Sequence, residues 1–480
     1  MGIVHQHAAL YTDFYELAMA QGYYLSGRHT QPAGFDYFFR KLPFKGGYVI
    51  FAGLHDLLEI LQDLKFGADD LEYLKSLGFR KEFLTFLKDF RFTGSLFSVR
   101  EGDVIFPYET VIRVEGNALE TQVIETVLLN ILNFESLIAT KASRVRQVAG
   151  TRSVIDFGLR RAQGLGGIHA SRAAIIGGAN STSNVYSARA FDLKTGGTMA
   201  HSWVEIFENE QEAFRAFAKI FPHDSVFLVD TYNTLSSGIP NAITVAREME
   251  KEGHRLNAIR LDSGDLAYLS RQARALLDNA GLPYVKIMVS NQLDEYIIKS
   301  LNEQGAPIDA FGVGTNLVVG KEDAALDGVY KLSLFNGIPK IKISDNLEKV
   351  VFPGFKKVYR YLDENENFYA DAIVGITEED VNEMVHPFVP NKKLSLKNNN
   401  REELLVCVMR DGQLMQDKIN PYDIQQWSSK RLSKLLPEHK RFENPHIYKV
   451  GISHSVMNLR EQLVTHYLEH INVKHEFKIK

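Results

Sequence analysis

The segment RLDSGD, residues 260–265, brings one guanidinium and two carboxylates together in a short stretch. Arg260 can bind a phosphate through two parallel hydrogen bonds, or neutralise charge above an aromatic ring. Asp262 and Asp265 can bind ribose hydroxyls or a magnesium ion. An internal salt bridge is the alternative, and the segment alone does not decide between a ligand site and a structural loop.

Two further segments suit ring and phosphate ligands. DFGLRR, residues 156–161, offers Phe157 for stacking against a ring and Arg160 for an anion. DAFGVGTNLV places Gly312 and Gly314 after an apolar run, where backbone N–H groups can approach an anion closely. A tight turn between a strand and a helix explains the same glycines when the segment is taken alone.

His201 lies in GGTMAHSWVE, residues 196–205, and is one of 15 histidines. No HExxH motif or Cys/His cluster accompanies it, which disfavours zinc. Glu205, four residues on, would share a helix face with His201. Its carboxylate could then hold one ring nitrogen and make the other a nucleophile. The same spacing fits an inert structural pair, so both interpretations stay open.

The elements that must position these residues repeat between about residues 120 and 320. Apolar, β-rich runs alternate with patterns of helical period, and four successive runs end at Asp230, Asp262, Ser290 and Gly314, separated by 32, 28 and 24 residues. Such spacing is typical of βα units with parallel strands. Because the active site gathers at the carboxyl ends of the strands in both an open sheet and a barrel, the sequence predicts an α/β fold with a site at this edge.

The flanking regions show other patterns. A helix is expected to begin at Asp13, with Glu16 completing a variant capping box. Residues 95–116 alternate like a small antiparallel sheet. Beyond about residue 340 we expect short strands and polar loops, with residues 391–401 as an exposed loop.

Composition excludes several classes of protein. Hydrophobic residues make up 45% and charged residues 24%, as in a globular chain of two or three domains. The net charge of −4 gives no general attraction to nucleic acid or to an anionic membrane. The single cysteine, Cys407, excludes an intrachain disulfide and fits a reducing compartment. We therefore expect a cytoplasmic protein with neither a signal peptide nor a membrane-spanning helix.

Taken together, the motifs resemble those of the nicotinate phosphoribosyltransferase family. The likeness runs in order through LYTDFYELAMAQGYY, FRKLPFKGGYVIFAG, DFGLRRA, STSNV, GGTMAHSWV, VDTYNT, RLDSGDLAYLS and FGVGTNLV. It implies an irregular α/β barrel of the type II phosphoribosyltransferases over residues 121–345, with a flanking α+β domain built from both termini. Residues 1–120 would form the N-terminal part, and residues 346–480 a C-terminal region packing on it and on the barrel.

The same motifs carry the family's site residues onto this chain. The resemblance implies that His201 is autophosphorylated, that Asp262 contacts the ribose hydroxyls, and that Arg260 serves the base and the phosphates. The implied substrate-binding residues are Tyr15 from the neighbouring subunit, Phe157, Arg160, Ser183, Asn184, Asp230, Thr231, Gly312, Gly314 and Thr315. The enzyme would thus be a homodimer with active sites at its interface.

The implied reaction joins nicotinate to the ribose of phosphoribosyl pyrophosphate, yields nicotinate mononucleotide and pyrophosphate, and is coupled to ATP hydrolysis in NAD biosynthesis. Mg²⁺ would be carried by the substrate phosphates rather than held tightly by protein ligands, with ATP as co-substrate and no organic prosthetic group. The departing pyrophosphate leaves oxocarbenium character at the ribose, which carboxylates stabilise, while magnesium and arginines disperse the departing charge.

Two other functions compete with this one. The nicotinamide-using relative reads the amide with an aspartate, whereas the matching segment here is Thr182-Ser183-Asn184. An acid would repel nicotinate's own carboxylate, so its absence favours nicotinate. A non-catalytic ligand-binding protein on the same barrel would have no need of a phosphorylatable His201. Quinolinate phosphoribosyltransferase shares the chemistry but is a much shorter chain without the histidine motif.

Overall fold

The computed structural model describes residues 7–343 and 351–475. The chain divides into two compact units. The first comprises Met1–Leu137, Ala325–Ile419 and Gln426–Lys480, and the second comprises Ile138–Ala324 and Asn420–Gln425. The first unit is thus assembled from both ends of the chain, and the second from its middle.

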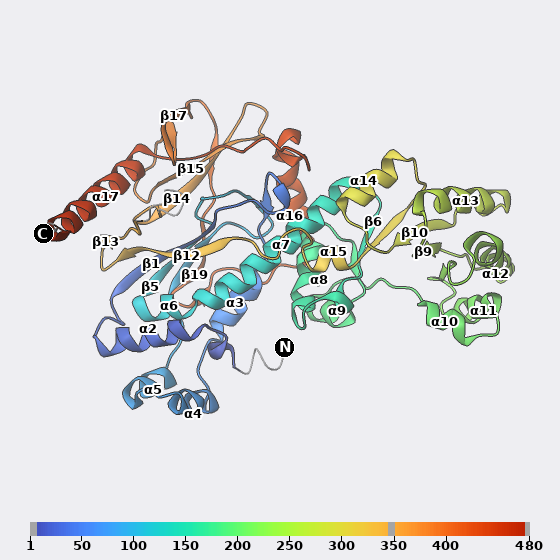
Figure 1. Ribbon diagram of the computed structural model, residues 1–480, viewed down its shortest axis with the longest axis horizontal. Helices are drawn as coiled ribbons and strands as arrows, with labels where there is room; N and C mark the ends of the chain where they lie inside the picture. The colour runs from blue at the N-terminus through green and yellow to red at the C-terminus, as the bar shows by residue number, and fades with distance from the viewer. Residues whose placement is uncertain (1–6, 344–350, 476–480) are drawn as a thin grey trace, which may run out of the picture. The chain divides into compact units, whose positions relative to one another are not determined.

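A parallel sheet forms the centre of the second unit (Figure 1). Its strands are β6 (Ser153–Asp156), β7 (Ser181–Thr182), β8 (Val226–Leu228), β9 (Ala258–Leu261), β10 (Lys286–Ser290) and β11 (Ala310–Val313). They lie in the order β7-β6-β11-β10-β9-β8, and every neighbouring pair is parallel. The α/β class predicted from the spacing of the strand ends is therefore confirmed, with β7 and β8 at the edges of the hydrogen-bonded ladder.

Helices follow the strands, as parallel connections require. They are α8 (Gly166–Gly177), α9 (Val185–Phe191), α10 (His201–Ile206), α11 (Glu210–Ile220), α12 (Ile239–Lys251), α13 (Leu266–Asn279), α14 (Glu295–Glu303), α15 (Thr315–Val318) and the end of α7 (Glu125–Ala149). Polar residues at the strand ends start several of them. Asp265 accepts a hydrogen bond from the backbone N–H of Tyr268 and caps α13, so its carboxylate belongs to a helix terminus.

The first unit contains two larger sheets and a small strand pair. One sheet has the order β13-β12-β1-β5-β3-β19-β20, the other has the order β17-β16-β21-β15-β14-β18, and β2 pairs with β4. The bounds are β1 (Pro32–Phe39), β2 (Val49–Ile50), β3 (Ser95–Ser98), β4 (Val104–Ile105), β5 (Ile112–Asn117), β12 (Gly328–Phe335), β13 (Ile338–Pro339), β14 (Lys356–Leu362), β15 (Phe368–Gly375), β16 (Glu383–His386), β17 (Val389–Ser395), β18 (Arg401–Glu403), β19 (Val406–Arg410), β20 (Gln413–Leu414) and β21 (Val450–Ile452). The predicted antiparallel pairing within residues 95–116 is seen in β3 and β5.

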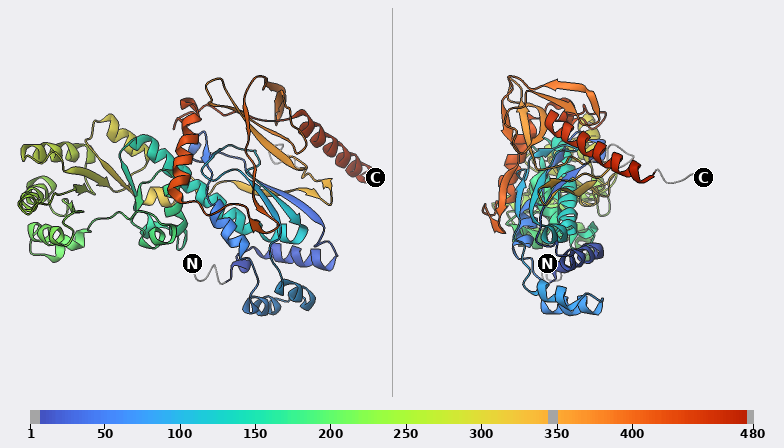
Figure 2. Two further views of the ribbon diagram at one scale, coloured as in Figure 1. Left: turned by 180° about the vertical axis from the view of Figure 1, so that it is seen from behind. Right: turned by 90° about the vertical axis from the view of Figure 1, so that its left-hand side faces the viewer.

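The two ends of the chain share one core in this unit. Phe35 of β1 stacks on Tyr330 of β12, and the same cluster of buried side chains includes Ile373 of β15. Figure 2 shows the blue N-terminal strands beside the later yellow and orange ones. The helices are α2 (Phe14–Leu25), α3 (Leu54–Gln62), α4 (Ala68–Ser76), α5 (Lys81–Lys88), α6 (Ala118–Val123), most of α16 (Pro421–Lys434) and α17 (His454–His475), along with the start of α7. No helix within residues 7–343 and 351–475 has the length and apolar character of a membrane span.

Two local expectations differ from the structure. Residues 391–395 are not loop but belong to β17, which pairs antiparallel with β16. Leu396 is buried at the end of this run, so alternation is hidden among its lysines and asparagines. At the start of α2, Asp13 holds the N-cap position without a side-chain cap bond, while the Glu16 side chain accepts hydrogen bonds from Thr12 and Thr126.

Candidate active site

The carboxyl ends of the parallel strands carry most of the predicted site residues. Phe157 follows β6, Ser183 follows β7, Asp230 lies two residues beyond β8, Asp262 follows β9, and Gly314 follows β11. Because all the strands run in one direction, these ends meet at one edge of the sheet (Figure 1).

Arg260 joins three segments at this edge. Its Nε donates to Ser290 Oγ at 3.0 Å, its Nη1 donates to Thr198 Oγ1 at 2.5 Å and to Met199 O at 3.1 Å, and its Nη2 donates to Asp262 Oδ1 at 3.3 Å. The residue is only 9% exposed. All three guanidinium nitrogens are therefore engaged, and Arg260 fixes β9 and β10 to the segment that precedes His201.

Two carboxylates continue this arrangement. Asp230 Oδ2 accepts from the Asp262 N–H at 2.8 Å and from Ser263 Oγ at 2.7 Å, which holds the loop after β9 against the end of β8. Asp230 Oδ1 is buried and finds no hydrogen-bond partner among the residues that the structure describes. Asp262 Oδ1 accepts from Ser290. One oxygen of Asp230 is thus left unsatisfied within the described protein.

His201 lies next to the Asp262 carboxylate. It is the first residue of α10, and its Nδ1 lies 3.1 Å from Thr231 Oγ1. Its Nε2 lies 3.8 Å from Asp262 Oδ2, with the two side chains 39% and 26% exposed. Among the described residues, no hydrogen bond joins the ring to Glu205. The ring bonds to Thr231 instead, so Thr231 has the role that the helical spacing suggested for Glu205. The ring is therefore held at one nitrogen and accessible at the other.

Phe157 lies over the glycine segment of β11. A Cβ on Gly312 would lie 2.5 Å from the Phe157 ring, so only glycine leaves room for it. The Arg260 guanidinium carbon lies 5.7 Å from the ring centroid, close enough for a cation–π contact. Gly312 thus has an observed packing role, and the phosphate cradle formed by Gly312, Gly314 and Thr315 stays a prediction.

The two polar residues predicted to bind the base, Ser183 and Asn184, differ in the burial of their side chains. Asn184 is fully buried: its Nδ2 donates to Gly167 O at 3.1 Å and Ser171 Oγ at 3.2 Å, and its Oδ1 accepts from Ser187 N. This side chain caps α9 and has no free atom for a ligand. Ser183 is half-buried, and Arg160 is exposed in the short 3₁₀ helix Leu159–Arg161.

Tyr15 belongs to α2 of the first unit, where it is 46% exposed. Burial of its hydroxyl, and then the carboxylates of Glu125 and Glu16, raise its pKa. Burial likewise raises the pKa of Glu16 to about 7. The predicted stacking of Tyr15 across a subunit interface stays a prediction.

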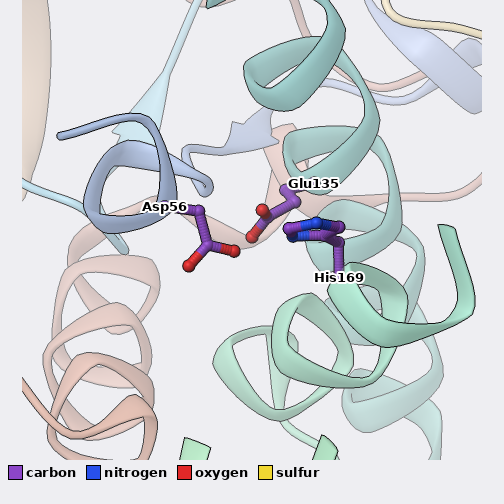
Figure 3. A group of neighbouring side chains, drawn as sticks. All are labelled: Asp56, Glu135 and His169. Atoms are coloured by element: carbon purple, nitrogen blue, oxygen red, sulfur yellow. The ribbon is translucent and has the colours of Figure 1, made fainter. Parts of the chain in front are cut away.

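Each unit contains carboxylate oxygens that could contribute to a divalent-cation site. In the second unit, the unpartnered oxygen of Asp230 and the Asp262 oxygen next to His201 are hard donors of the kind that suits Mg²⁺ and its water shell. In the first unit, carboxylate oxygens of Asp56 on α3 and Glu135 on α7 lie within 4.8 Å of each other (Figure 3). That pair alone is too few ligands for a tight site, and the third residue labelled in the figure, His169, belongs to the other unit.

Sequence reasoning missed the hydroxyl groups that hold the charged residues. Thr198 and Ser290 both bind Arg260, and Thr231 binds His201. The sequence identifies Ser290 only as a strand end, and Thr231 only as an implied substrate-binding residue. Hydroxyls at the ends of adjacent parallel strands are the signal that points to such contacts.

A parallel βα sheet with an arginine, two carboxylates and a histidine at its carboxyl edge defines an α/β enzyme that handles phosphorylated substrates. Comparisons narrow this class. The model of the nicotinate phosphoribosyltransferase family matches residues 152–378, and those of the family's N-terminal and C-terminal domains match residues 10–133 and 355–460. The chain therefore belongs to the nicotinate phosphoribosyltransferase family.

Individual relatives are similar in sequence over nearly the whole chain. The nicotinate phosphoribosyltransferase of Bacillus subtilis is 41% identical over 476 residues, covering 96% of each chain. That of Bos taurus is 30% identical, covering 95% of this chain and 96% of its own. The crystal structure of human nicotinic acid phosphoribosyltransferase superposes with a TM-score of 0.85 at 29% identity, covering 94% of this chain and 99% of that one. Nicotinate-nucleotide pyrophosphorylase from Pyrococcus furiosus shares the fold, with a TM-score of 0.70 at 23% identity over 89% of this chain and 95% of that one.

Proposed function

We propose that this enzyme transfers the phosphoribosyl group of phosphoribosyl pyrophosphate to nicotinate in NAD biosynthesis. One observation carries the proposal: Arg260, Asp262, Asp230 and His201 converge at the carboxyl edge of the sheet, in a chain of this family. The ring nitrogen of nicotinate forms a bond to the ribose C1 as the bond from C1 to the pyrophosphate oxygen breaks. The electron pair of the broken bond leaves with the pyrophosphate.

The residues of this edge mainly position the substrates and stabilise the charge that develops in the transition state. Phe157 provides the flat surface for the pyridine ring. Positive charge develops on the ribose in the transition state, and the Asp262 carboxylate and the free oxygen of Asp230 stabilise it electrostatically. Mg²⁺, carried by the substrate phosphates, would supply charge neutralisation for the departing pyrophosphate.

The choice of nicotinate follows from the segment after β7. Thr182 and Asn184 have buried side chains, so Ser183 is the residue of this segment left to meet a base. A serine hydroxyl donates to a carboxylate without repelling it. The nearby Asp156 is turned inward and accepts three hydrogen bonds from the protein, which keeps its charge away from the base.

His201 is the proposed site of phosphorylation by ATP. With Nδ1 donating to Thr231 Oγ1, Nε2 keeps its lone pair and is the nucleophile. The bond from Nε2 to the γ-phosphorus forms, the bond from that phosphorus to the ADP oxygen breaks, and water later cleaves the phosphohistidine to inorganic phosphate. A phosphate at Nε2 would lie beside Asp262, next to the proposed pyrophosphate position.

We further propose a cytoplasmic homodimer in which Tyr15 of one subunit completes the base site of the other. Tyr15, Phe14 and Met19 all expose apolar surface on α2, as residues of a subunit interface would. Sedimentation velocity gives the mass of the assembly. Tyr15→Ala should raise the KM for nicotinate, and mixing it with an Arg260→Ala variant should restore activity in part if sites are shared between subunits.

One experiment tests the activity. The purified chain receives phosphoribosyl pyrophosphate with nicotinate or nicotinamide, with and without ATP, and the products are separated by chromatography. Nicotinate mononucleotide formed faster with ATP is the expected result. Product from nicotinamide alone would contradict the substrate, and no product from either base would favour the non-catalytic binding protein.

A further inference from the structure

Asp156 is a buried acid that bonds to the segments of Phe157 and Ser183, the two residues proposed to contact the base. It ends β6, directly before Phe157, and is 2% exposed. Its Oδ1 accepts from Gly158 N at 2.8 Å, while Oδ2 accepts from Ser171 Oγ at 2.8 Å and from Thr182 Oγ1 at 2.7 Å. Gly158 N and the Thr182 hydroxyl donate to it, and the single proton of the Ser171 hydroxyl is shared between it and Gly167 O at 3.0 Å, so the site suits a side chain that only accepts.

Thr182 connects Asp156 to residues 183–184, the segment proposed to bind the base. It ends β7, is fully buried, and precedes Ser183. Its hydroxyl accepts from the Asn184 N–H at 3.0 Å while donating to Asp156. A hydroxyl has one proton, so the direction of both bonds is fixed by the carboxylate. The Asp156 carbonyl also accepts from Ser183 N at 2.8 Å, which holds the same segment from its backbone.

The other oxygen of Asp156 holds the segment that carries the stacking ring. Its bond to Gly158 N fixes the turn directly after Phe157. A Cβ on Gly158 would lie 2.6 Å from Val318 Cβ and 3.0 Å from Asp156 Oδ1, so this turn is closely packed against α15 as well. One carboxylate therefore sets the separation between Phe157 and Ser183.

We propose that Asp156 and Thr182 are positioning residues of the nicotinate site. Their hydrogen bond fixes the distance between the ring that stacks on the pyridine and the hydroxyl that meets its carboxylate. The inference rests on the proposed function and assigns it two residues that make no contact with substrate.

Thr182→Val tests this directly, because it removes the hydroxyl and keeps the shape of the side chain. The Asn184 N–H loses its acceptor and Asp156 loses a donor, so the segment of Ser183 shifts. We expect the KM for nicotinate to rise about tenfold, as loss of one buried hydrogen bond implies. The KM for phosphoribosyl pyrophosphate should change by less than about twofold, since its proposed contacts lie on other strands. Thr182→Ser keeps the hydroxyl and should restore the nicotinate KM.

Two further variants separate positioning from simple loss of stability. Ser270→Ala removes a fully buried hydroxyl that, among the described residues, bonds only within α13, and should leave both KM values unchanged. Asp156→Asn turns an N–H₂ group toward the hydroxyls of Thr182 and Ser171, and should reproduce the nicotinate KM change if Thr182→Val does not fold. Melting temperatures of all variants are compared alongside the kinetics.

The outcomes are distinct. An active wild type whose Thr182→Val variant keeps the wild-type nicotinate KM overturns this inference alone. Equal changes in both KM values that follow the loss in melting temperature also overturn it, because they indicate a purely structural role. A wild type that forms no mononucleotide overturns the proposed function and this inference with it.

Discussion

Two arginine–aspartate networks, one in each unit, use the same chemistry for different ends. In the first unit Arg360 is 0% exposed, and its guanidinium binds both oxygens of Asp371 and, at 3.0 Å, Asp103 Oδ1. Arg431 and Tyr448 supply further donors to these two acids. In the second unit Arg260 binds one acid and two hydroxyls, and the acid faces a half-exposed histidine.

The two networks differ in which polar atoms have no partner in the protein. Around Arg360 the charges are neutralised by one another, so the network joins β14, β15 and α16 within a sealed core. Around Arg260, one oxygen of Asp230 has no hydrogen-bond partner among the described residues, and the Nε2 of His201 has only a 3.8 Å contact with Asp262 Oδ2. We expect that breaking the closed network lowers the free energy of unfolding, because acids stay buried without their cation, whereas breaking the open network lowers activity. Breaking each network in turn tests this division.

The largest expected effect is that of His201→Ala. Without Nε2 no phosphohistidine can form, so ATP hydrolysis should fall to background while slow transfer without ATP persists. The free energy of unfolding should change by less than about 0.5 kcal/mol, because the ring is partly exposed. Phosphate release and mononucleotide formation are measured together. Glu205→Gln is the control, since Glu205 does not bind the ring, and substrate-dependent ATP hydrolysis by His201→Ala would refute the role given to this residue.

Next comes Arg360→Met, which leaves Asp371 and Asp103 buried without this cation. Urea denaturation should show a loss of about 3–5 kcal/mol in the free energy of unfolding. The folded fraction should keep its KM values. Arg401→Met is the matched control: its partner Asp380 is 90% exposed, so its loss should cost less than about 1 kcal/mol. Equal losses for the two variants would contradict the sealed network.

Arg260→Lys is expected to act on catalysis rather than on folding. Lysine keeps the charge but cannot bind Ser290, Thr198 and Asp262 at once. Steady-state kinetics should show kcat/KM reduced by about a hundredfold, with melting temperature little changed. A lysine variant with wild-type kcat/KM would show that charge alone is required, and not the guanidinium geometry.

The smallest effect concerns Glu16 in the first unit, whose folded pKa of about 7 lies above the ordinary value of 4.5 because of burial. The neutral acid is the form favoured by folding. Its contribution is fully present below pH 4.5 and is lost as pH rises through about 7. Glu16→Gln should therefore gain about 1 kcal/mol relative to wild type between pH 5 and pH 8, after allowance for solvent screening. A difference independent of pH in urea titrations would contradict the raised pKa.

Much of the fold could be predicted from local sequence. The run ends at Asp230, Asp262, Ser290 and Gly314 lie within two residues of the ends of successive strands, because the spacing of βα units is a local property of the sequence. Strand β17 was missed because its alternation is hidden among polar residues, and its pairing with β16 decides its structure.

The site could be predicted in its charged residues but not in their partners. Glu205 is the helical neighbour of His201, yet the ring binds Thr231, which the fold brings from the end of another strand. Asn184 matches a base-reading position, yet its side chain caps α9 and is buried. Contacts between segments distant in sequence depend on register and packing, which local patterns do not encode.

Hydrogen–deuterium exchange with and without phosphoribosyl pyrophosphate and Mg²⁺ tests the comparison most directly. The open network should take the substrate, so peptides covering residues 196–203, 226–232 and 258–265 should gain protection. Peptides covering residues 101–106 and 358–373, which contain the sealed network, should exchange as before. Protection confined to the sealed network, or absent from the edge of the parallel sheet, would contradict the placement of the active site.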